Sequence, residues 1–414
     1  MTFSKHDRQI VRSLAQKVME ISALPVKDEQ RTLWTRLNRL ERVRPLVWIN
    51  EIPWDELRGE ELDCQSEHAY ARELEGSLRT TLYLWNHMRT DMVVDPFYIV
   101  NYVYHDSGFG LDEVTVRKEG VFGGFVAVDY VPIIKTEADI ERILMPMITP
   151  DWAATEHRYE MACDLLGDVM PVVKRGIVHQ WFAPWDTLIR WWGIEELFLD
   201  ITDRPEFVHK GIARMVDAYL CQLDQLEALG LLSVSNGNHR VGSGGLGITD
   251  ELPQPDYDGI HARPIDQCGN STAQIFAPVS PAMHEEFALQ HELRWLERFG
   301  LNCYGCCDPL DKKMGIARKI PRLRRVSMSP WIDLDRAVQA VGRDYIFSYK
   351  PTPAVFAWSD WNFDQARKDL VKALEKTRGC VVEVIMKDIS TCRHEPRRIW
   401  EWCEMAMQVV EDYA

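Results

Sequence analysis

The strongest local signal for chemistry is a cluster of three cysteines, Cys303, Cys306 and Cys307, in the segment LNCYGCCDPL. The text around it predicts a strand over 301–306, so Cys306 or Cys307 would lie at the carboxyl end of that strand. Thiolates bind Zn²⁺ tightly, and zinc with an open fourth position can activate a bound substrate atom. An adjacent cysteine pair lacks the spacing of the common zinc motifs, so packing of small apolar side chains is the alternative.

A further metal ligand has to come from another strand end. Glu383 lies inside the apolar run VVEVIMKD, where an unpaired carboxylate is costly, so it is expected to be paired or metal-bound. Asp388 follows the same predicted strand, and His239 follows a predicted strand over 231–235. Cys380 begins the last strand and is assigned to packing. The choice between Glu383 and Asp388 stays open.

Other polar and aromatic side chains also follow predicted strands. Candidate proton donors or acceptors are His179, His239 and Lys350. Candidate substrate-binding residues are Trp48, Asn50, Glu51, Trp181, Trp185, Asn236 and Asn238. Together the tryptophans favour a flat apolar cavity for an aromatic or other planar ligand. The alternative is that these large side chains fill the ends of the core.

A glycine-rich segment, Gly242 to Gly247 (GSGGLG), matches the dinucleotide-binding pattern G-x-G-x-x-G. That pattern needs a helix to start at the loop, and the following text, ITDELPQPDYDG, cannot form one. We therefore expect a flexible loop over the mouth of the fold.

Composition narrows the class of protein. The chain has 414 residues, 46% of them apolar, which is enough for a large core. Its 48 Lys and Arg against 63 Asp and Glu give a formal charge of -15, which disfavours nucleic acid and anionic membranes as partners. No secretion signal is visible, and the apolar runs fall well below the roughly 20 residues of a membrane span. We expect a cytoplasmic protein whose cysteines are free thiols.

Strand-like and helix-like segments alternate along the chain. Predicted strands start at Pro45, Met92, Met170, Leu231, Leu301, Arg325, Tyr345 and Val381, and most are followed by a helix. Eight such units predict an α/β fold of the TIM (β/α)8 barrel type, with a doubly wound open sheet as the alternative. Residues 1–40 are predicted to form an N-terminal helical extension and 41–414 the barrel. Residues 121–134 are predicted to form a β-hairpin insertion.

From about Arg44 onward the chain resembles the uroporphyrinogen decarboxylase-like superfamily of TIM barrels, which includes zinc-dependent methyltransferases serving corrinoid proteins. The segments that carry the resemblance are RPLVWIN, WDTLIRWWGIEELFLDITDRPEFVHKGIARMVDAYLCQLDQLEALGLLSVSNGN, SPAMHEEFALQHELRWLERFGLNCYGCCDPL and EVIMKDISTCRHEPRRIWEW. The decarboxylases carry arginines after the first strand, where this chain has NEIPW. The methyltransferases carry His-x-Cys where this chain has Tyr304, Gly305 and Cys306, so the cysteine carries over and the histidine does not.

The resemblance implies a zinc-dependent methyltransferase that moves a methyl group from a small methylated substrate to the cobalt of a corrinoid. An aryl methyl ether is the favoured donor, so O-demethylation is the expected reaction. Zinc would be held by Cys306 or Cys307 with Glu383 or Asp388, and the corrinoid (cobalamin) would be carried by a partner protein. A homodimer is one assembly the chain could form. The alternative is a metal-free decarboxylase or lyase of a planar carboxylic acid, using Lys350, Lys387 and Arg240.

Overall fold

A computed structural model describes residues 3–118 and 127–413. The helices are α1 Lys5–Ser22, α2 Pro25–Asn38, α3 Ala69–His87, α4 Glu137–Ile140, α5 Trp152–Leu166, α6 Pro184–Trp192, α7 Ile194–Asp203, α8 Pro205–Ala228, α9 Pro281–His284, α10 Gln290–Leu296, α11 Met314–Ala317, α12 Leu334–Val341, α13 Phe363–Lys376 and α14 Arg397–Glu411. The strands are β1 Leu46–Ile49, β2 Tyr98–Asn101, β3 Tyr104–Asp106, β4 Thr115–Lys118, β5 Ala127–Tyr130, β6 Ile148–Pro150, β7 Val172–Arg175, β8 Cys268–Ser271, β9 Leu301–Tyr304, β10 Leu323–Met328, β11 Ile346–Tyr349 and β12 Val381–Met386.

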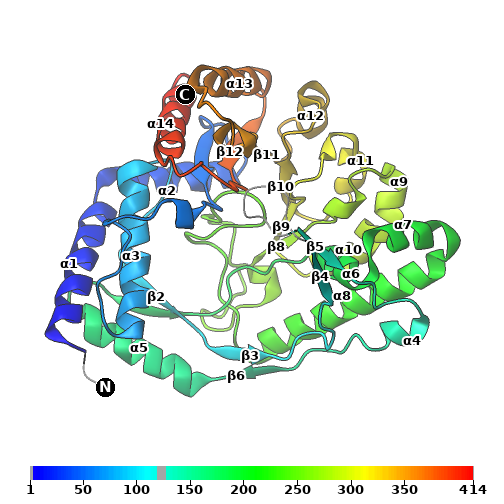
Figure 1. The fold of residues 1–414 in the computed structure, drawn as a ribbon, viewed down its shortest axis with the longest axis horizontal. Helices are drawn as coiled ribbons and strands as arrows, with labels where there is room; N and C mark the ends of the chain where they lie inside the picture. Colours follow the sequence, from blue (N-terminus) through cyan, green and yellow to red (C-terminus); the bar gives the residue numbers. More distant parts are fainter. Residues whose placement is uncertain (1–2, 119–126, 414) are drawn as a thin grey trace.

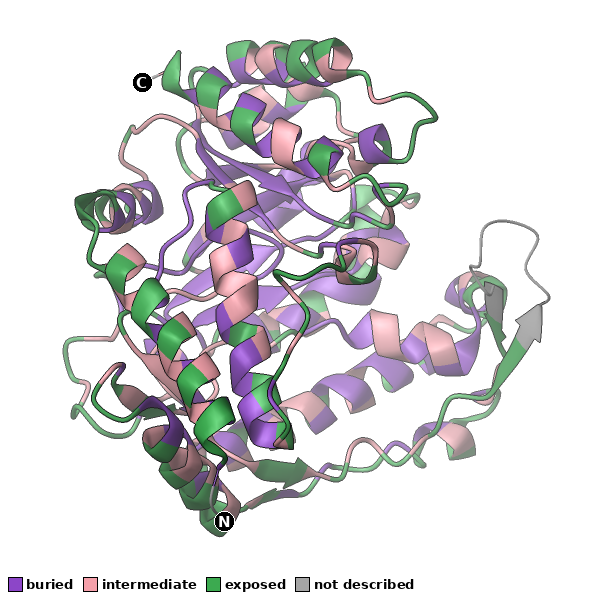
Figure 2. Ribbon diagram, turned by 60° about the vertical axis from the view of Figure 1, so that its left-hand side comes forward, coloured by how far each residue is buried: buried purple, intermediate pink, exposed green. Residues whose placement is uncertain are grey.

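The central element is a parallel six-stranded sheet with the order β1-β12-β11-β10-β9-β8. Ile49 pairs with Met386, and Met328 pairs with Tyr349, so the strands end at one edge of the sheet. Figure 1 shows these strands inside a ring of helices, and Figure 2 shows that buried residues gather on the strands and on the inner faces of the helices. Side chains that directly follow β1 and β9 to β12 therefore lie at a common edge.

The hydrogen bonding does not close these strands into the expected eight-stranded barrel. Strands β2 and β7 form a separate parallel pair, and only an isolated bridge joins Ile177 to Leu232 in the predicted strand over 231–235. Within the described ranges the fold is therefore an α/β arrangement around an open parallel sheet. The predicted strand that begins at Met92 forms only at its end, as β2.

The structure contains helices where the N-terminal extension was predicted and a strand pair near the predicted hairpin. Helices α1 and α2 lie in the first 40 residues, although the division into two domains stays a prediction. Strands β4 and β5 pair antiparallel as a hairpin that projects from the body in Figure 2. Residues 121–126 of the predicted hairpin lie outside the described residues. Among those described, no helix is both long enough and apolar enough to cross a membrane.

The glycine-rich segment is buried, and the expectation of a flexible loop over the mouth is wrong. A Cβ atom added to Gly244 would lie 2.2 Å from Arg325 and 2.6 Å from Glu383, and one added to Gly245 would lie 2.4 Å from Trp34. Glycine is needed here because the backbone passes this close to buried side chains. The segment therefore fills the inside of the fold rather than covering a ligand.

Candidate functional site

A pocket of about 240 Å³ lies at the carboxyl ends of β9 to β12. Its lining residues come from the segments that follow these strands and are Cys306, Cys307, Ser329, Pro330, Trp331, Lys350, Pro351, Thr352, Pro353, Ala354, Lys387 and Asp388. The sheet register explains this gathering, because parallel strands release their following residues at one edge. The pocket combines thiols, two lysines and a carboxylate with walls of proline and tryptophan.

The two adjacent cysteines form a thiol pair. Their Sγ atoms lie 3.5 Å apart, and Cys307 Sγ lies 3.5 Å from Asp388 Oδ2. Cys306 is buried, whereas Cys307 is exposed. The backbone N–H of Cys306 donates to Asp308 Oδ1 at 3.0 Å, which holds the turn after β9 in place. Cys306, Cys307 and Asp388 are thus brought together from segments far apart in the sequence.

Lys387 places its ammonium group against this pair. Its Nζ lies 3.6 Å from Cys306 Sγ, 3.9 Å from Cys307 Sγ and 2.8 Å from Asp388 Oδ2. The hydrogen bond with Cys307, together with the charge of Lys387, lowers the pKa of Cys306 to about 6 against the effect of burial. Although burial opposes it, the negative charge of Cys306 raises the pKa of Lys387. Cys306 is therefore the thiolate of the pair near neutral pH.

The pKa of Cys307 is raised and that of Lys350 is lowered, the reverse of the shifts at Cys306 and Lys387. The hydrogen bond to Cys306 and burial raise the pKa of Cys307, so this thiol keeps its proton. Burial lowers the pKa of Lys350 to about 7. Lys350 Nζ donates to Ser348 Oγ at 2.6 Å, and it exchanges its proton close to neutral pH.

An ionic network borders the pocket on the β1 side. Glu51 binds Arg240 at 2.5 Å and Lys387 at 3.4 Å, and its carboxylate accepts the backbone N–H of Asp388 at 3.1 Å. The Asn50 amide faces the Arg240 guanidinium at 3.2 Å. Glu51 and Asn50 were predicted to bind substrate. In the structure they lie next to the pocket, where Glu51 pairs with Arg240 and Lys387 and Asn50 faces Arg240.

Glu383 lies apart from the thiols. It is fully buried, forms an ion pair with Arg325 at 2.8 Å and accepts a hydrogen bond from Ser348 Oγ at 2.5 Å. The N–H of Gly245 also donates to it, at 3.2 Å. The structure therefore pairs this carboxylate inside the sheet and does not bring it to Cys306 and Cys307.

Both predicted catalytic histidines are held by other protein groups. His179 Nδ1 donates to Cys268 O at 3.0 Å, while its Nε2 accepts the Gly242 N–H at 2.9 Å. His239 Nε2 lies 2.8 Å from Ser235 Oγ. Burial lowers the pKa of His179 to about 4 and that of His239 to about 3, so both are neutral. Neither lines the thiol pocket.

The tryptophan and asparagine side chains predicted to bind substrate lie in different parts of the fold. Trp185 is fully buried against Phe276, Trp48 packs into the core beside α2, and Trp181 is exposed. The aromatic side chain that does line the pocket is Trp331, which is 76% exposed. Asn236 and Asn238 line a different cavity, together with His239.

A buried polar relay lies beneath the site and was not anticipated. Lys313 Nζ donates to His284 Nδ1 at 3.0 Å, His284 Nε2 contacts Tyr304 OH at 2.6 Å, and this hydroxyl donates to Glu292 at 3.1 Å. A π-helical turn at Glu285–Leu289 joins α9 to α10, which carry His284 and Glu292. The sequence signal was present, since His284, Ala288 and Glu292 share one helix face at i, i+4 spacing.

This relay predicts a pH-dependent stability. Burial raises the pKa of Glu292 to about 7 from an ordinary 4.5, so folding favours the protonated form. Stability is therefore lost as pH rises through this window, by on the order of 3 kcal/mol. Glu292→Gln should gain stability relative to wild type between pH 5 and pH 8 in urea unfolding. Glu286→Gln, an exposed neighbour, is the control, and parallel profiles for wild type and Glu292→Gln would contradict the assignment.

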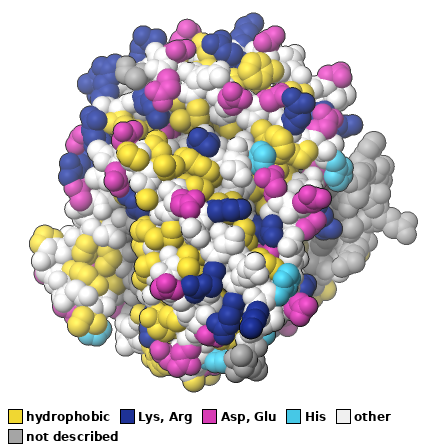
Figure 3. All heavy atoms as spheres, turned by 90° about the vertical axis from the view of Figure 1, so that its left-hand side faces the viewer, with side chains coloured by type: hydrophobic (Ala, Val, Ile, Leu, Met, Phe, Trp, Pro, Cys, Tyr) yellow, Lys and Arg dark blue, Asp and Glu magenta, His cyan; other side chains and the backbone are white. Residues whose placement is uncertain are grey.

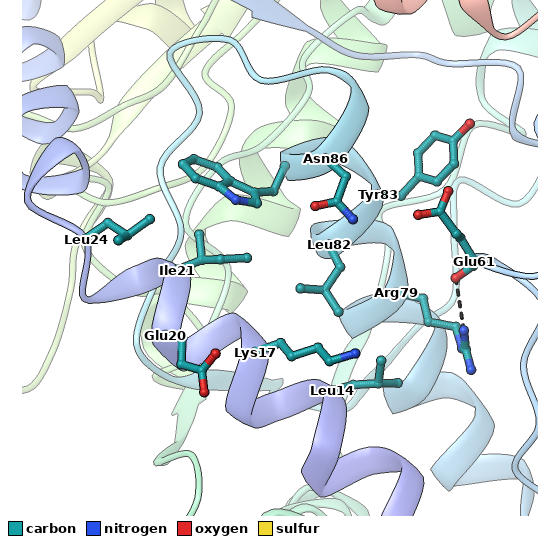
Figure 4. A pocket seen from close by; sticks show the side chains of 11 residues that line it. Leu14, Lys17, Glu20, Ile21, Leu24, Glu61, Arg79, Leu82, Tyr83 and Asn86 are labelled. Atoms are coloured by element: carbon teal, nitrogen blue, oxygen red, sulfur yellow. Dashed lines mark hydrogen bonds between the residues drawn. The ribbon is translucent and has the colours of Figure 1, made fainter.

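A groove of about 400 Å³ between α1 and α3 is larger than the thiol pocket. Figure 4 shows Leu14, Ile21 and Leu82 along it with Lys17 and Arg79. In Figure 3 the side of the molecule that carries α1 and α3 has apolar side chains interspersed with both basic and acidic ones. The described lining of this groove contains no thiol, and Lys17 and Arg79 lie there with Glu20 and Glu61, so the thiol pocket is the better candidate for the site of chemistry.

The residue types at the thiol pair can be compared with those that bind metal ions. In the described ranges no group of three or more His, Cys, Asp or Glu side chains is already arranged to hold a metal. The Lys387 ammonium is nevertheless a cation surrounded by Cys306, Cys307, Asp388 and Glu51. Thiolates and carboxylates are donors that zinc prefers, and the Lys387 ammonium occupies the position between them.

Comparisons with known proteins add little to this geometry. No protein-family model and no curated protein sequence matches the chain. Among solved structures it is similar to a methyltransferase from Methanosarcina mazei, at 10% sequence identity and a TM-score of 0.49, over 93% of this chain and 98% of that chain. Similarity at this level carries no information about the reaction of this chain.

Proposed function

We propose that this protein is a cytoplasmic methyltransferase that takes a methyl group from a small methylated donor and delivers it to the cobalt of a corrinoid on a partner protein. An aryl methyl ether is the favoured donor. The observation that carries the proposal is the Cys306–Cys307 thiol pair in a pocket at the carboxyl ends of neighbouring parallel strands. Such strand ends are where α/β enzymes place their reactive groups.

Zinc fits the proposed site through Cys306, Cys307 and Asp388. When bound, it would supply a Lewis acid for the ether oxygen, which keeps the bonding electrons and stays on the demethylated aryl product. Lys387 would then pair with Glu51, which already lies 3.4 Å from it. Glu383 stays outside this ligand set because Arg325 and Ser348 engage it.

The remaining pocket residues can bind and orient a small planar donor. Trp331, Pro330 and Pro353 offer flat apolar surfaces to a ring. Lys350 can hold or release a proton near the leaving oxygen, since its pKa is about 7. The small volume limits the donor to about the size of a single ring.

A second candidate function is a metal-free decarboxylase or lyase of a planar carboxylic acid. The observation that favours it is that Lys350 and Lys387 both line the pocket. Lys387, however, is already bound to Asp388 and Glu51. Its charge is therefore largely compensated, which leaves Lys350 as the group able to hold a carboxylate.

Metal analysis combined with a transfer assay separates the two candidates. Protein purified without chelator should contain about one zinc ion per chain, as a catalytic site requires. With cob(I)alamin and a methoxybenzene donor, methylcobalamin should form and be detected by absorbance. Less than about 0.2 zinc per chain with no methylcobalamin would exclude the methyltransferase. Release of CO₂ from an aromatic acid by such metal-free protein would favour the alternative.

A further inference from the structure

A second cavity, of about 480 Å³, lies between the start of α2, the end of β7 and the segment 234–239. It shares no lining residue with the thiol pocket. Its polar lining includes Arg31, Asp95, Arg175 and His239, and its apolar wall includes Phe97 and Val234. The cavity is therefore a separate amphipathic site.

Arg175 is the unusual member of this lining. Its guanidinium has no hydrogen bond or ion pair with any residue that the structure describes, and its Nε is buried without a partner. Arg175 and Val173 lie two apart on β7, so they share one face of the strand, and both line the cavity. Burial lowers the pKa of Arg175, as expected for a desolvated cation, and the nearby Asp95 carboxylate offsets only part of this effect.

The neighbouring cations and Asp95 already have partners. Asp95 binds Arg31 at 2.5 Å and accepts a hydrogen bond from Asn238 at 3.1 Å. Lys174 pairs with Glu156 at 2.6 Å. His239 is neutral, because burial lowers its pKa to about 3. Among the described residues that line the cavity, Arg175 is thus the cation whose guanidinium makes no hydrogen bond or ion pair, while Asp28 adds a second carboxylate to the lining.

We propose that this cavity binds a small organic carboxylate, with the carboxylate on the Arg175 guanidinium and an apolar body against Phe97, Val173 and Val234. Arginine is suited to this role because its planar fork matches a carboxylate with two parallel hydrogen bonds. A single guanidinium without a bonded partner, in a lining that also holds the carboxylates of Asp28 and Asp95, favours a monoanion over a phosphate dianion. The apolar wall favours an aromatic or branched acid over a small hydrophilic one.

Calorimetric titration of the full chain with benzoate tests the site. Wild type should bind benzoate and bind neither benzyl alcohol, which lacks the charge, nor inorganic phosphate with comparable affinity. Arg175→Gln should weaken benzoate binding by about tenfold or more, because a bidentate charged contact is lost. Arg175→Lys should fall between the two, since it keeps the charge and loses the fork.

Controls fix the location of binding. Arg343→Gln changes an arginine outside the cavity that donates to Gly379 O, and it should leave the affinity unchanged. Cys306→Ser should also bind benzoate normally, which keeps this test independent of the proposed methyltransferase. Arg175→Gln should fold, because its guanidinium loses no partner, and thermal melting checks this. The proposal is overturned if wild type binds no benzoate, if phosphate binds more tightly, or if both Arg175 variants retain full affinity.

Discussion

Cys306→Ser should lower the rate of methylcobalamin formation by about a hundredfold or more, because the proposed function makes Cys306 a thiolate ligand of the metal. Of the two adjacent thiols, Cys306 is the one whose pKa is lowered, to about 6, so it is the stronger ligand and nucleophile of the pair at neutral pH. The measurement is the initial rate of transfer to cob(I)alamin, with zinc per chain determined on the same samples. Iodoacetamide should alkylate one thiol rapidly in wild type, and this rapid reaction should be absent in Cys306→Ser.

Two other cysteine variants make this result specific. Cys307→Ser removes the thiol that donates to Cys306 and contacts Asp388, and it should reduce zinc content as well. Cys380→Ser is the matched control, because this half-buried cysteine lies at the start of β12 and outside the pocket. Wild-type rates and zinc content in both Cys306→Ser and Cys307→Ser would refute the thiol pair as the site.

Glu383→Gln should lower the free energy of unfolding by about 3–5 kcal/mol, as expected when one partner of a buried ion pair is removed. Glu383 and Arg325 are both buried, and the guanidinium left behind would face only Asn38 and the Cys303 thiol. Ser348 and Gly245 also donate to Glu383, so the carboxylate organises the inside of the sheet. Guanidinium unfolding with a constant m-value measures the loss.

A surface pair provides the comparison for this effect. Asp335→Asn removes the exposed partner of Lys376 and should lower the free energy of unfolding far less, because water solvates the lysine left behind. The double variant Glu383→Gln with Arg325→Met should recover part of the loss, because no unpaired charge is left buried. Equal stability of Glu383→Gln and wild type, combined with loss of zinc, would instead make Glu383 a metal ligand.

Strands with a continuous apolar pattern were predictable from the chain alone. Val381–Met386 forms β12 over the predicted run, because these residues are buried on both faces of a parallel sheet. Strand β8, Cys268–Ser271, was missed because CGNS has neither an apolar run nor alternation. It becomes a strand because it pairs with β9, and the local amino-acid sequence does not specify such a long-range contact. The open sheet has the same origin, since closure depends on pairing between distant segments.

Residue types and strand ends in the sequence were enough to select Cys306, Cys307, Asp388 and Lys350, and the structure gathers all of them in one pocket. The same reasoning selected His239, Asn236 and Asn238, which the structure places in the separate cavity that contains Arg175. That a residue follows a strand in the sequence does not tell which part of the fold its side chain will face. Only the register and the course of the intervening loops decide this.

The sequence by itself determined the chemical inventory: an acidic chain, an adjacent thiol pair after a strand, and a carboxylate that had to be paired inside an apolar strand. The tertiary structure decided the partners, with Arg325 for Glu383 and Lys387 for the thiols. The physical reason is that charge pairing and pKa depend on distances of a few ångströms between segments far apart in the chain. Such distances arise only when packing brings those segments together.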